Sequence, residues 1–217
     1  MSQLPDLIMF GIQGAGKGTQ AKLIHHDFPQ YHIFETGAEL RHIASQDSDL
    51  GREVNEVITK GGFVDNNLIF NLIRNFLQNV PENAPVIFDG FPRKEIQREG
   101  FEEIMAEFHR SPIGIHLELE EEHSINRLLN RFICAGVDTS DHPLITEAEC
   151  LARGGNIVRR SDDNLESIKN RIDAFQKETT QAINWYRERN RLFDIPGHHS
   201  PHQVHAVIVE KLKLGAE

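Results

Sequence analysis

The sequence predicts an α/β fold in which a five-stranded parallel sheet is flanked by helices. Two observations support this prediction. Short apolar runs alternate with longer stretches of helical periodicity, as in repeated βα units. A glycine-rich segment also follows the first apolar run and leads into the first helical stretch. Because 217 residues are enough for one well-buried core, we expect a single domain over residues 1–217 that carries inserted lobes.

Five apolar runs are short enough, and sufficiently bounded by turn residues, to be strands. They are residues 7–10, 32–34, 86–89, 113–119 and 192–195. The stretches between and after them repeat apolar residues at helical spacing. The expected helices lie near 17–28, 37–45, 50–60, 67–79, 94–108, 122–131, 165–190 and 202–214. The helix over 165–190 has the clearest repeat, and Asp163 with Glu166 is typical of a capping box at its start.

Two stretches depart from the βα alternation. Residues 35–64 contain two expected helices in succession with no strand between them. Residues 132–158 are rich in Gly, Thr, Asp and Pro and lack a long helical pattern. We therefore expect both stretches to be lobes inserted into the main domain.

The glycine-rich segment at residues 11–19 reads Gly-Ile-Gln-Gly-Ala-Gly-Lys-Gly-Thr and indicates a phosphate-binding loop. Glycines let successive N–H groups turn toward phosphate oxygens, the following helix presents its positive N-terminus, and Lys17 can reach the β- and γ-phosphates. An ordinary turn would not need four glycines and a lysine at this spacing. Gly18 stands where Ser or Thr usually meets Mg²⁺, and the hydroxyl comes one residue later at Thr19. We therefore expect Mg²⁺ to be held through water by a separate carboxylate, Asp89, at the end of a strand.

The composition of the chain bears on its binding partners and on its cellular location. A formal charge of −10 provides no basic surface for nucleic acid or an anionic membrane, so we expect neither as a partner. The 15 arginines outnumber the 8 lysines, and arginine grips phosphate with a planar fork. No apolar run is long enough to span a membrane and no signal peptide is apparent, so we expect a cytoplasmic protein. In that compartment the two cysteines, Cys134 and Cys150, are expected to be reduced.

Four blocks of the sequence, in this order, resemble the adenylate kinases within the nucleoside monophosphate kinase family. They are residues 11–20 with the Lys-Gly-Thr order, 36–41, 89–93 with Gln97 four residues after the arginine, and 160–163 followed by Arg171. Two positions depart from the family pattern: Gln13 replaces a usual proline and Ala38 a usual aspartate. The resemblance implies a P-loop three-layer fold and an enzyme that transfers a phosphoryl group from Mg·ATP to AMP. It also implies that the lobe 35–64 binds AMP and that the lobe 132–158 is a lid over ATP.

The resemblance also implies roles for individual residues. For ATP binding these are Gly14, Ala15, Gly16, Lys17, Gly18, Thr19, Arg127 and Arg131. For AMP binding they are Thr36, Gly37, Arg41, Gly62, Phe63, Val64, Gly90, Arg93, Gln97, Arg160 and Arg171. The catalytic set is Lys17, Arg93, Arg131, Arg160 and Arg171, and Asp89 would hold Mg²⁺ through water. This set suits the chemistry, because the acceptor is already a phosphate oxygen and the enzyme must mainly position and neutralise two polyanions.

The lid sequence keeps only part of a zinc ribbon that some relatives carry. Cys134 and Cys150 remain, but Val137 and Arg153 stand where the second cysteine of each pair would be, and His142 and Asp138 lack ligand spacing. We therefore do not expect a structural zinc. The twelve histidines show no metal-ligand spacing and are expected on the surface.

Three alternatives remain open at the level of sequence. A kinase for UMP, CMP or another monophosphate would share most of these residues, although Thr36 and Gln97 favour adenine. A catalytically weak nucleotide-binding paralogue would share all of them. A nucleotide-controlled switch would require an Asn-Lys-x-Asp guanine reader, which the sequence lacks. We expect a monomer with ATP and AMP as its partners.

Overall fold

The computed structural model describes residues 4–60, 62, 64–139, 143–160 and 162–214. At its centre is a parallel sheet of five strands in the order β2-β3-β1-β4-β7. These strands are β1 (Leu7–Gly11), β2 (His32–Glu35), β3 (Val86–Asp89), β4 (Ile113–Glu118) and β7 (Leu192–Pro196). The predicted five-stranded parallel sheet is confirmed.

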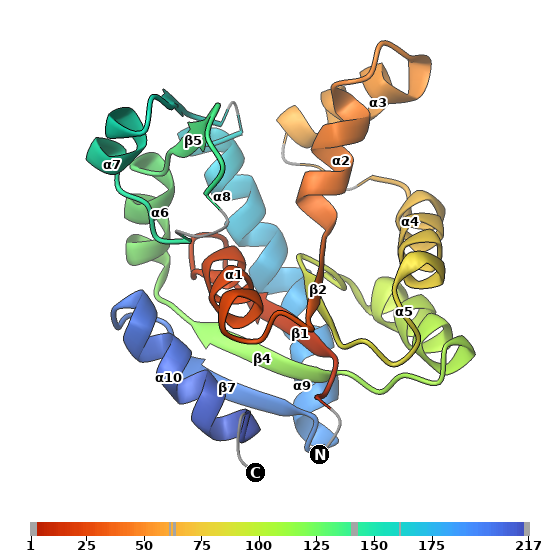
Figure 1. Ribbon diagram of the computed structural model, residues 1–217. Coiled ribbons are helices and arrows are strands. Elements are labelled where there is room, and N and C mark those ends of the chain that lie inside the picture. The colour runs from red at the N-terminus through yellow and green to blue at the C-terminus, as the bar shows by residue number, and fades with distance from the viewer. Residues whose placement is uncertain (1–3, 61, 63, 140–142, 161, 215–217) are drawn as a thin grey trace.

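Helices cover both faces of this sheet (Figure 1). On one face lie α1 (Lys17–Asp27) and α10 (Pro201–Leu212), and on the other lie α5 (Glu95–Glu107) and α9 (Thr180–Glu188), with α4 (Asn66–Asn79) beside α5. Successive residues of β1 point to opposite faces, so Leu7 and Met9 join one apolar cluster while Ile8 and Phe10 join the other. A central parallel strand is buried on both faces, which is why β1 is a continuous apolar run.

The strand register brings chemically active residues to one edge of the sheet. Asp89 pairs with Met9 of β1 on one side and with Glu35 of β2 on the other. The chain leaves β1 at Gly11, two residues beyond Met9. The loop after β1 therefore emerges beside two carboxylates at the carboxyl ends of the strands, where open α/β folds bind ligands.

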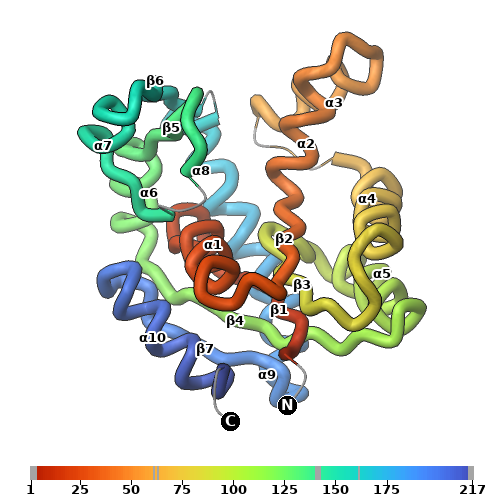
Figure 2. The backbone as a smooth tube through the Cα atoms, in the orientation of Figure 1, coloured from red at the N-terminus to blue at the C-terminus, as the bar shows by residue number. Residues whose placement is uncertain are grey.

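The stretch 35–64 projects away from the sheet as two helices, α2 (Thr36–Ala44) and α3 (Asp49–Thr59) (Figure 2). They pack around a small apolar cluster of their own that contains Leu40, Ile43 and Val54. The Ser48 side chain caps α3 by accepting a hydrogen bond from the N–H of Gly51.

The stretch 132–158 forms a small lobe next to α6 (Glu121–Leu129). Two three-residue strands, β5 (Ile133–Ala135) and β6 (Asn156–Val158), pair antiparallel, and α7 (Glu147–Ala152) lies between them in sequence. A disulfide joins Cys134 of β5 to Cys150 of α7, so the expectation of two reduced thiols is wrong. The turn of the chain through α7 brings their Cα atoms to within 5.7 Å of each other. Two cysteines 16 residues apart in the sequence do not by themselves predict this contact.

The stretch 165–190 is not the single α-helix that its periodicity predicts. It divides into α8 (Leu165–Ala174), a π-helical turn η1 (Phe175–Thr179) and α9. The wider turn lets Phe175 pack against both apolar clusters and stack on His116. The predicted capping box at Asp163 is also wrong, because Asn164 caps α8 by accepting from the N–H of Ser167. Among the described helices, none combines the length and apolar character needed to cross a bilayer.

Candidate active site

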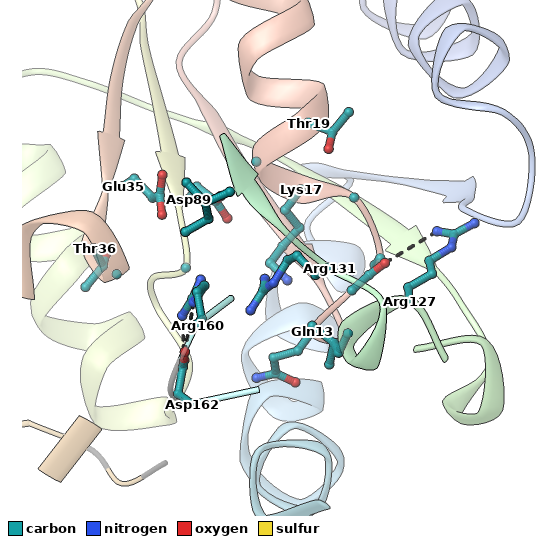
Figure 3. A pocket seen from close by; sticks show the side chains of 18 of the residues that line it. Gln13, Lys17, Thr19, Glu35, Thr36, Asp89, Arg127, Arg131, Arg160 and Asp162 are labelled. Atoms are coloured by element: carbon teal, nitrogen blue, oxygen red, sulfur yellow. Dashed lines mark hydrogen bonds and ion pairs between the residues drawn. The ribbon is translucent and has the colours of Figure 1, made fainter. Parts of the chain in front are cut away.

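A cleft of about 940 Å³ lies where the sheet edge faces both lobes, and its size suits nucleotide ligands. Its walls come from the loop after β1, the start of α2, the end of β3, the end of α6 and residues on both sides of the 132–158 lobe. Figure 3 shows how side chains from these separate elements point into one space. All five residues expected to be catalytic line it, namely Lys17, Arg93, Arg131, Arg160 and Arg171.

The loop after β1 wraps around the Lys17 side chain. The Nζ atom of Lys17 donates hydrogen bonds to the carbonyl oxygens of Gly11 at 2.8 Å and Ile12 at 3.1 Å. Gly14 has a φ of +81°, and a Cβ there would lie 3.0 Å from the Ser124 carbonyl oxygen, so only glycine fits. The Ser124 hydroxyl in turn donates to the Gln13 carbonyl, which ties this loop to α6.

Lys17 and Asp89 form the electrostatic centre of the cleft. Burial lowers the pKa of Lys17 to about 8, and nearby Asp89 partly opposes this effect. Burial also raises the pKa of Asp89, against the attraction of Lys17. A Cβ at Gly18 would lie 3.3 Å from Asp89 Oδ2, so the glycine at this position leaves room beside the carboxylate. The next residue, Thr19, also lines the cleft.

One wall of the cleft is formed by the beginning of α2. Arg41 donates to the Glu35 carboxylate at 2.7 Å, and its guanidinium lies over Gly37, where a Cβ would come within 2.8 Å of it. Thr36 is buried and lines the cleft, and its hydroxyl oxygen has no hydrogen-bond partner among the described residues. A buried hydroxyl without a partner is costly, so this group favours a ligand that pairs with it.

Behind Thr36, an amide network fixes the segment after β3. The Gln97 carbonyl accepts from the N–H of Arg93, and the Gln97 amide donates to Asn66 Oδ1, both at 2.9 Å. The Arg93 side chain donates to the Gly90 carbonyl at 2.8 Å. The second N–H of the Gln97 amide remains for a ligand in the cleft, which Gln97 lines.

Two adjacent carboxylates, Asp162 and Asp163, hold three of the expected arginines. Asp163 accepts two hydrogen bonds from Arg131, at 2.6 and 2.7 Å, and one from Arg171 at 3.1 Å. Asp162 accepts from Arg160 and from Arg171. Burial, the largest single effect, would raise the pKa of Asp162, but the hydrogen bond from Arg160 and the charges of Arg160, Arg171 and Arg131 together outweigh it, and the pKa is lowered. These carboxylates were not among the expected site residues, although they lie two and three positions after Arg160 in sequence.

A second unexpected contribution comes from the segment after β7. Gly197, His199 and Pro201 line the cleft next to Arg127. Arg127 donates to the Gly197 carbonyl at 3.1 Å and to the Gly14 carbonyl at 3.4 Å, so it joins this segment to the loop after β1. His199 is exposed, as expected, yet it also lines the cleft, which the sequence did not indicate. It directly follows another histidine, and such a pair carries no local signal of a position in a cleft.

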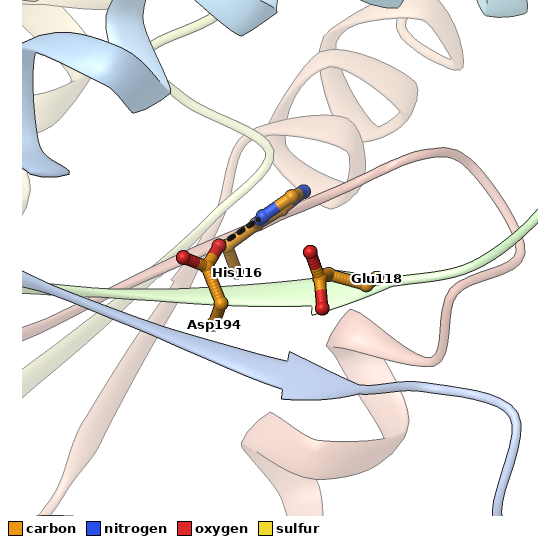
Figure 4. A group of neighbouring side chains, drawn as sticks. All are labelled: His116, Glu118 and Asp194. Carbon is orange, nitrogen blue, oxygen red and sulfur yellow. Dashed lines mark hydrogen bonds and ion pairs between the residues drawn. The ribbon is translucent and has the colours of Figure 1, made fainter.

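Three carboxylate or imidazole ligand atoms gather outside the cleft, on β4 and β7 (Figure 4). They belong to His116, Glu118 and Asp194, and they lie within 4.8 Å of one another. Arg187 already donates to both oxygens of Asp194, at 2.7 and 3.0 Å, and His116 pairs with the same carboxylate at 2.7 Å. We interpret the group as an ion-pair network that links the two strands to α9.

The remaining expected site residues divide into two groups. Gly14, Ala15, Gly16, Gly18, Gly62, Val64 and Gly90 all line the cleft. Phe63 lies outside the described residues, as does His142, which was considered as a zinc ligand and not expected to be one.

Comparison with known proteins gives a consistent result. Residues 9–191 match the family model described as Adenylate kinase. A protein named adenylate kinase from Methanocella arvoryzae is 33% identical over 195 residues, which is 88% of this chain and 90% of that protein. One of the same name from Bacillus licheniformis is 32% identical over 212 residues, 95% of this chain and 97% of its own. Another, from Staphylococcus aureus strain Mu50, is 32% identical over 197 residues, 88% and 91% respectively.

Proposed function

The chain belongs to the adenylate kinase family and catalyses phosphoryl transfer between ATP and AMP; we propose that the cleft described above is where the transfer takes place. In this proposal ATP binds between the loop after β1, Arg127 and the lobe 132–158, and AMP binds between α2, Gln97 and the end of β3. The observation that carries the proposal is the convergence of Lys17 and four arginines from separate elements on one cleft.

The reaction needs no nucleophilic side chain, because an oxygen of the AMP phosphate attacks the γ-phosphorus of ATP while ADP leaves. The protein must bring two polyanions together and neutralise charge on the transferring group. Lys17 would meet the β- and γ-phosphates of ATP, and Arg41 and Arg93 would grip the AMP phosphate. Arg41 would exchange its pairing with Glu35 for that phosphate. The arginines held by Asp162 and Asp163 would face the group in transfer, already oriented before substrates arrive.

Magnesium fits the same edge of the sheet. The Asp89 carboxylate supplies the oxygen ligands that this ion prefers, Gly18 leaves space beside it, and the Thr19 hydroxyl is close in sequence. We propose that Asp89 holds Mg²⁺ through water. Bound with ATP, the ion would neutralise phosphate charge.

We further propose that the two projecting lobes are the moving parts of the enzyme, with 35–64 closing over AMP and 132–158 over ATP. Closure would exclude water, which competes with AMP for the phosphoryl group. Action as a monomer stays a prediction, which analytical ultracentrifugation would test. A cytoplasmic location stays a prediction for cell fractionation.

A kinase for UMP or CMP is the alternative that the site does not favour. Thr36 offers an unpaired buried hydroxyl and Gln97 a spare amide N–H on the AMP side, both suited to the polar edge of adenine. The decisive test is a coupled assay of ADP formation from Mg·ATP with AMP, UMP, CMP and GMP in parallel. AMP should be preferred by at least about 10²-fold in kcat/KM, because a site that pairs buried polar groups rejects a ligand lacking the partner. Equal turnover of AMP and UMP would contradict the proposal.

A further inference from the structure

The lobe 132–158 has almost no buried interior. Among its described residues, only Cys150 and Gly155 are buried. Of its larger apolar side chains, Ile133 is exposed to 43%, Leu151 to 59% and Val158 to 44%, and the other described ones are only half-buried. None of the three apolar clusters of the molecule includes a described residue of this lobe. Packing therefore contributes little to its fold.

What fills the small interior is the disulfide itself. It joins β5 to α7, while β6 is held to β5 by a ladder of only three residue pairs. A Cβ at Gly155 would lie 2.8 Å from both the Cys134 and the Cys150 sulfur atoms, so the backbone at Gly155 packs directly on the disulfide. A lobe without an apolar core needs a covalent link or a comparable constraint to stay folded.

The two sulfur atoms differ in their surroundings. Cys150 is fully buried, whereas Cys134 is half-buried and lines the cleft assigned above to the nucleotides. A thiolate from solvent can approach Cys134 through that cleft, and Cys150 is then the leaving group. The disulfide holds the lobe together and one of its sulfur atoms can be reached from the cleft. It is therefore a candidate for reversible reduction.

We propose that the Cys134–Cys150 disulfide is a redox modification site whose reduction by a dithiol loosens the lid and weakens ATP binding; the ATP part of this inference rests on the proposed function. One thiolate of the dithiol attacks Cys134 Sγ, the S–S bond breaks, and Cys150 leaves as a thiolate that takes up a proton. The second thiol of the reductant then closes its own disulfide and releases Cys134 as a thiol. The protein gains two electrons and two protons, and the dithiol is oxidised.

The size of the effect follows from the loop that the bond closes. A link across 16 residues shifts the equilibrium between ordered and open lobe by roughly 100-fold. Arg131 remains paired with Asp163 at the base of the lobe, so the catalytic arginines keep their support after reduction. We therefore expect the KM for ATP to rise on reduction by up to about 100-fold, because the binding-competent closed population falls, while the KM for AMP stays unchanged.

The test uses the full chain prepared in two forms, one oxidised with glutathione disulfide and one reduced with dithiothreitol. Mass spectrometry after maleimide labelling counts the free thiols. Amide hydrogen exchange of peptides over 133–139 and 143–158 measures how often the lobe opens, and peptides from α10 serve as an internal reference. Because the chain has only two cysteines, the reductant has no other disulfide to act on. Reduction should accelerate amide exchange of the lobe by about 100-fold, with α10 unchanged.

Two variants make the comparison specific. Cys134→Ser with Cys150→Ser should behave as the reduced protein, with faster amide exchange of the lobe and a raised KM for ATP. Dithiothreitol should change neither quantity in this variant. Ala135→Ser with Ala152→Ser adds two hydroxyls to the same lobe without touching the disulfide, and should keep the full redox response.

Three results would overturn the proposal. The first is equal lobe exchange in the oxidised and reduced proteins. The second is a pair of thiols that glutathione disulfide cannot join. The third is stoichiometric zinc on the purified protein, since the thiols would then serve a metal. Failure of the proposed function is seen separately: an oxidised protein that forms no ADP from Mg·ATP and AMP contradicts it, whereas the exchange measurement needs no turnover.

Discussion

Replacement of Lys17 by Met separates what this residue does for catalysis from what it does for stability. The substitution keeps the length of the side chain and removes its charge. If Lys17 meets the transferring phosphate, kcat should fall by at least about 10²-fold, the scale for one preorganised electrostatic donor. The folded protein should meanwhile become slightly more stable at neutral pH, because the charged amine is buried at a cost.

The magnitude follows from the pKa and the hydrogen bonds. Lowering the pKa of Lys17 from 10.5 to about 8 corresponds to a destabilisation of about 3 kcal/mol at pH 7. The variant loses two hydrogen bonds to backbone carbonyls, of about 1 kcal/mol each. The net gain at pH 7 is about 1 kcal/mol, or a rise in Tm of about 2–4 °C for a chain of this size.

The stability of the wild type changes with pH in the direction opposite to that expected for a lysine in a stabilising salt bridge. The folded-state pKa lies below the unfolded one, so the unfolded chain binds more protons between about pH 8 and 10.5, and wild type gains stability as the pH rises through that window. At pH 9.5 the destabilisation from Lys17 has fallen to about 1.4 kcal/mol, less than the two hydrogen bonds contribute. Lys17→Met should therefore be the more stable protein at pH 7 and the less stable one at pH 9.5.

Urea unfolding of both proteins measures the difference in unfolding free energy at pH 7 and at pH 9.5. A coupled ADP assay at pH 7 measures the change in kcat. Lys169→Met, which removes an exposed charge from α8, is the matched control and should change neither turnover nor the pH dependence. Near-normal turnover of Lys17→Met would refute the assignment of the loop. A stability difference that does not change between pH 7 and 9.5 would refute the electrostatic argument.

Three further substitutions test other parts of the site and fold. Gln97→Leu should raise the KM for AMP by at least about 10-fold and leave that for ATP unchanged in the coupled assay, and an equal rise in both would contradict its role. His199→Ala should raise only the KM for ATP, by about 3-fold, because it lines the cleft in the segment that Arg127 contacts at Gly197. Asp194→Asn should lower the unfolding free energy by about 1 kcal/mol at pH 7 in urea titrations, since the carboxylate pairs with Arg187 and His116 near the surface. The pKa of Asp194 is held below its usual range, first by the Arg187 hydrogen bond, so this difference should be constant above about pH 4 and should shrink as the pH falls from there through the lowered pKa of the folded protein. A difference that does not shrink as the pH falls below about 4 would contradict the argument.

The sequence was informative wherever a local pattern has a direct structural cause. Buried parallel strands read as short apolar runs, and the expected run at 86–89 is the strand Val86–Asp89. The phosphate loop was recognisable because its glycines and lysine must lie close together at a fixed spacing. The same reasoning located the start of α2 within one residue.

Contacts between distant residues left no comparable pattern. The bond between Cys134 and Cys150 depends on how α7 folds back on β5, and two isolated cysteines do not reveal it. The pairing of Asp163 with Arg131 depends on the packing of α6 against α8, so that aspartate resembled a helix cap. His199 reaches the cleft only because β7 ends beside β4, where Gly197 donates to the Glu118 carbonyl.

The pair formed by Arg131 and Asp163 also has a consequence for how the lid can vary. These residues stand at the two ends of the segment that carries the lid and are 32 positions apart, so their hydrogen bonds fasten the base of a large loop. Residues added at the far tip of such a loop alter its closure entropy only slightly, about 0.6 kcal/mol for each doubling of length. The base, and with it the arginine proposed to face the phosphates, keeps its position. Length and composition of the tip are therefore free to diverge between relatives, or to be redesigned, while the geometry of phosphoryl transfer is preserved.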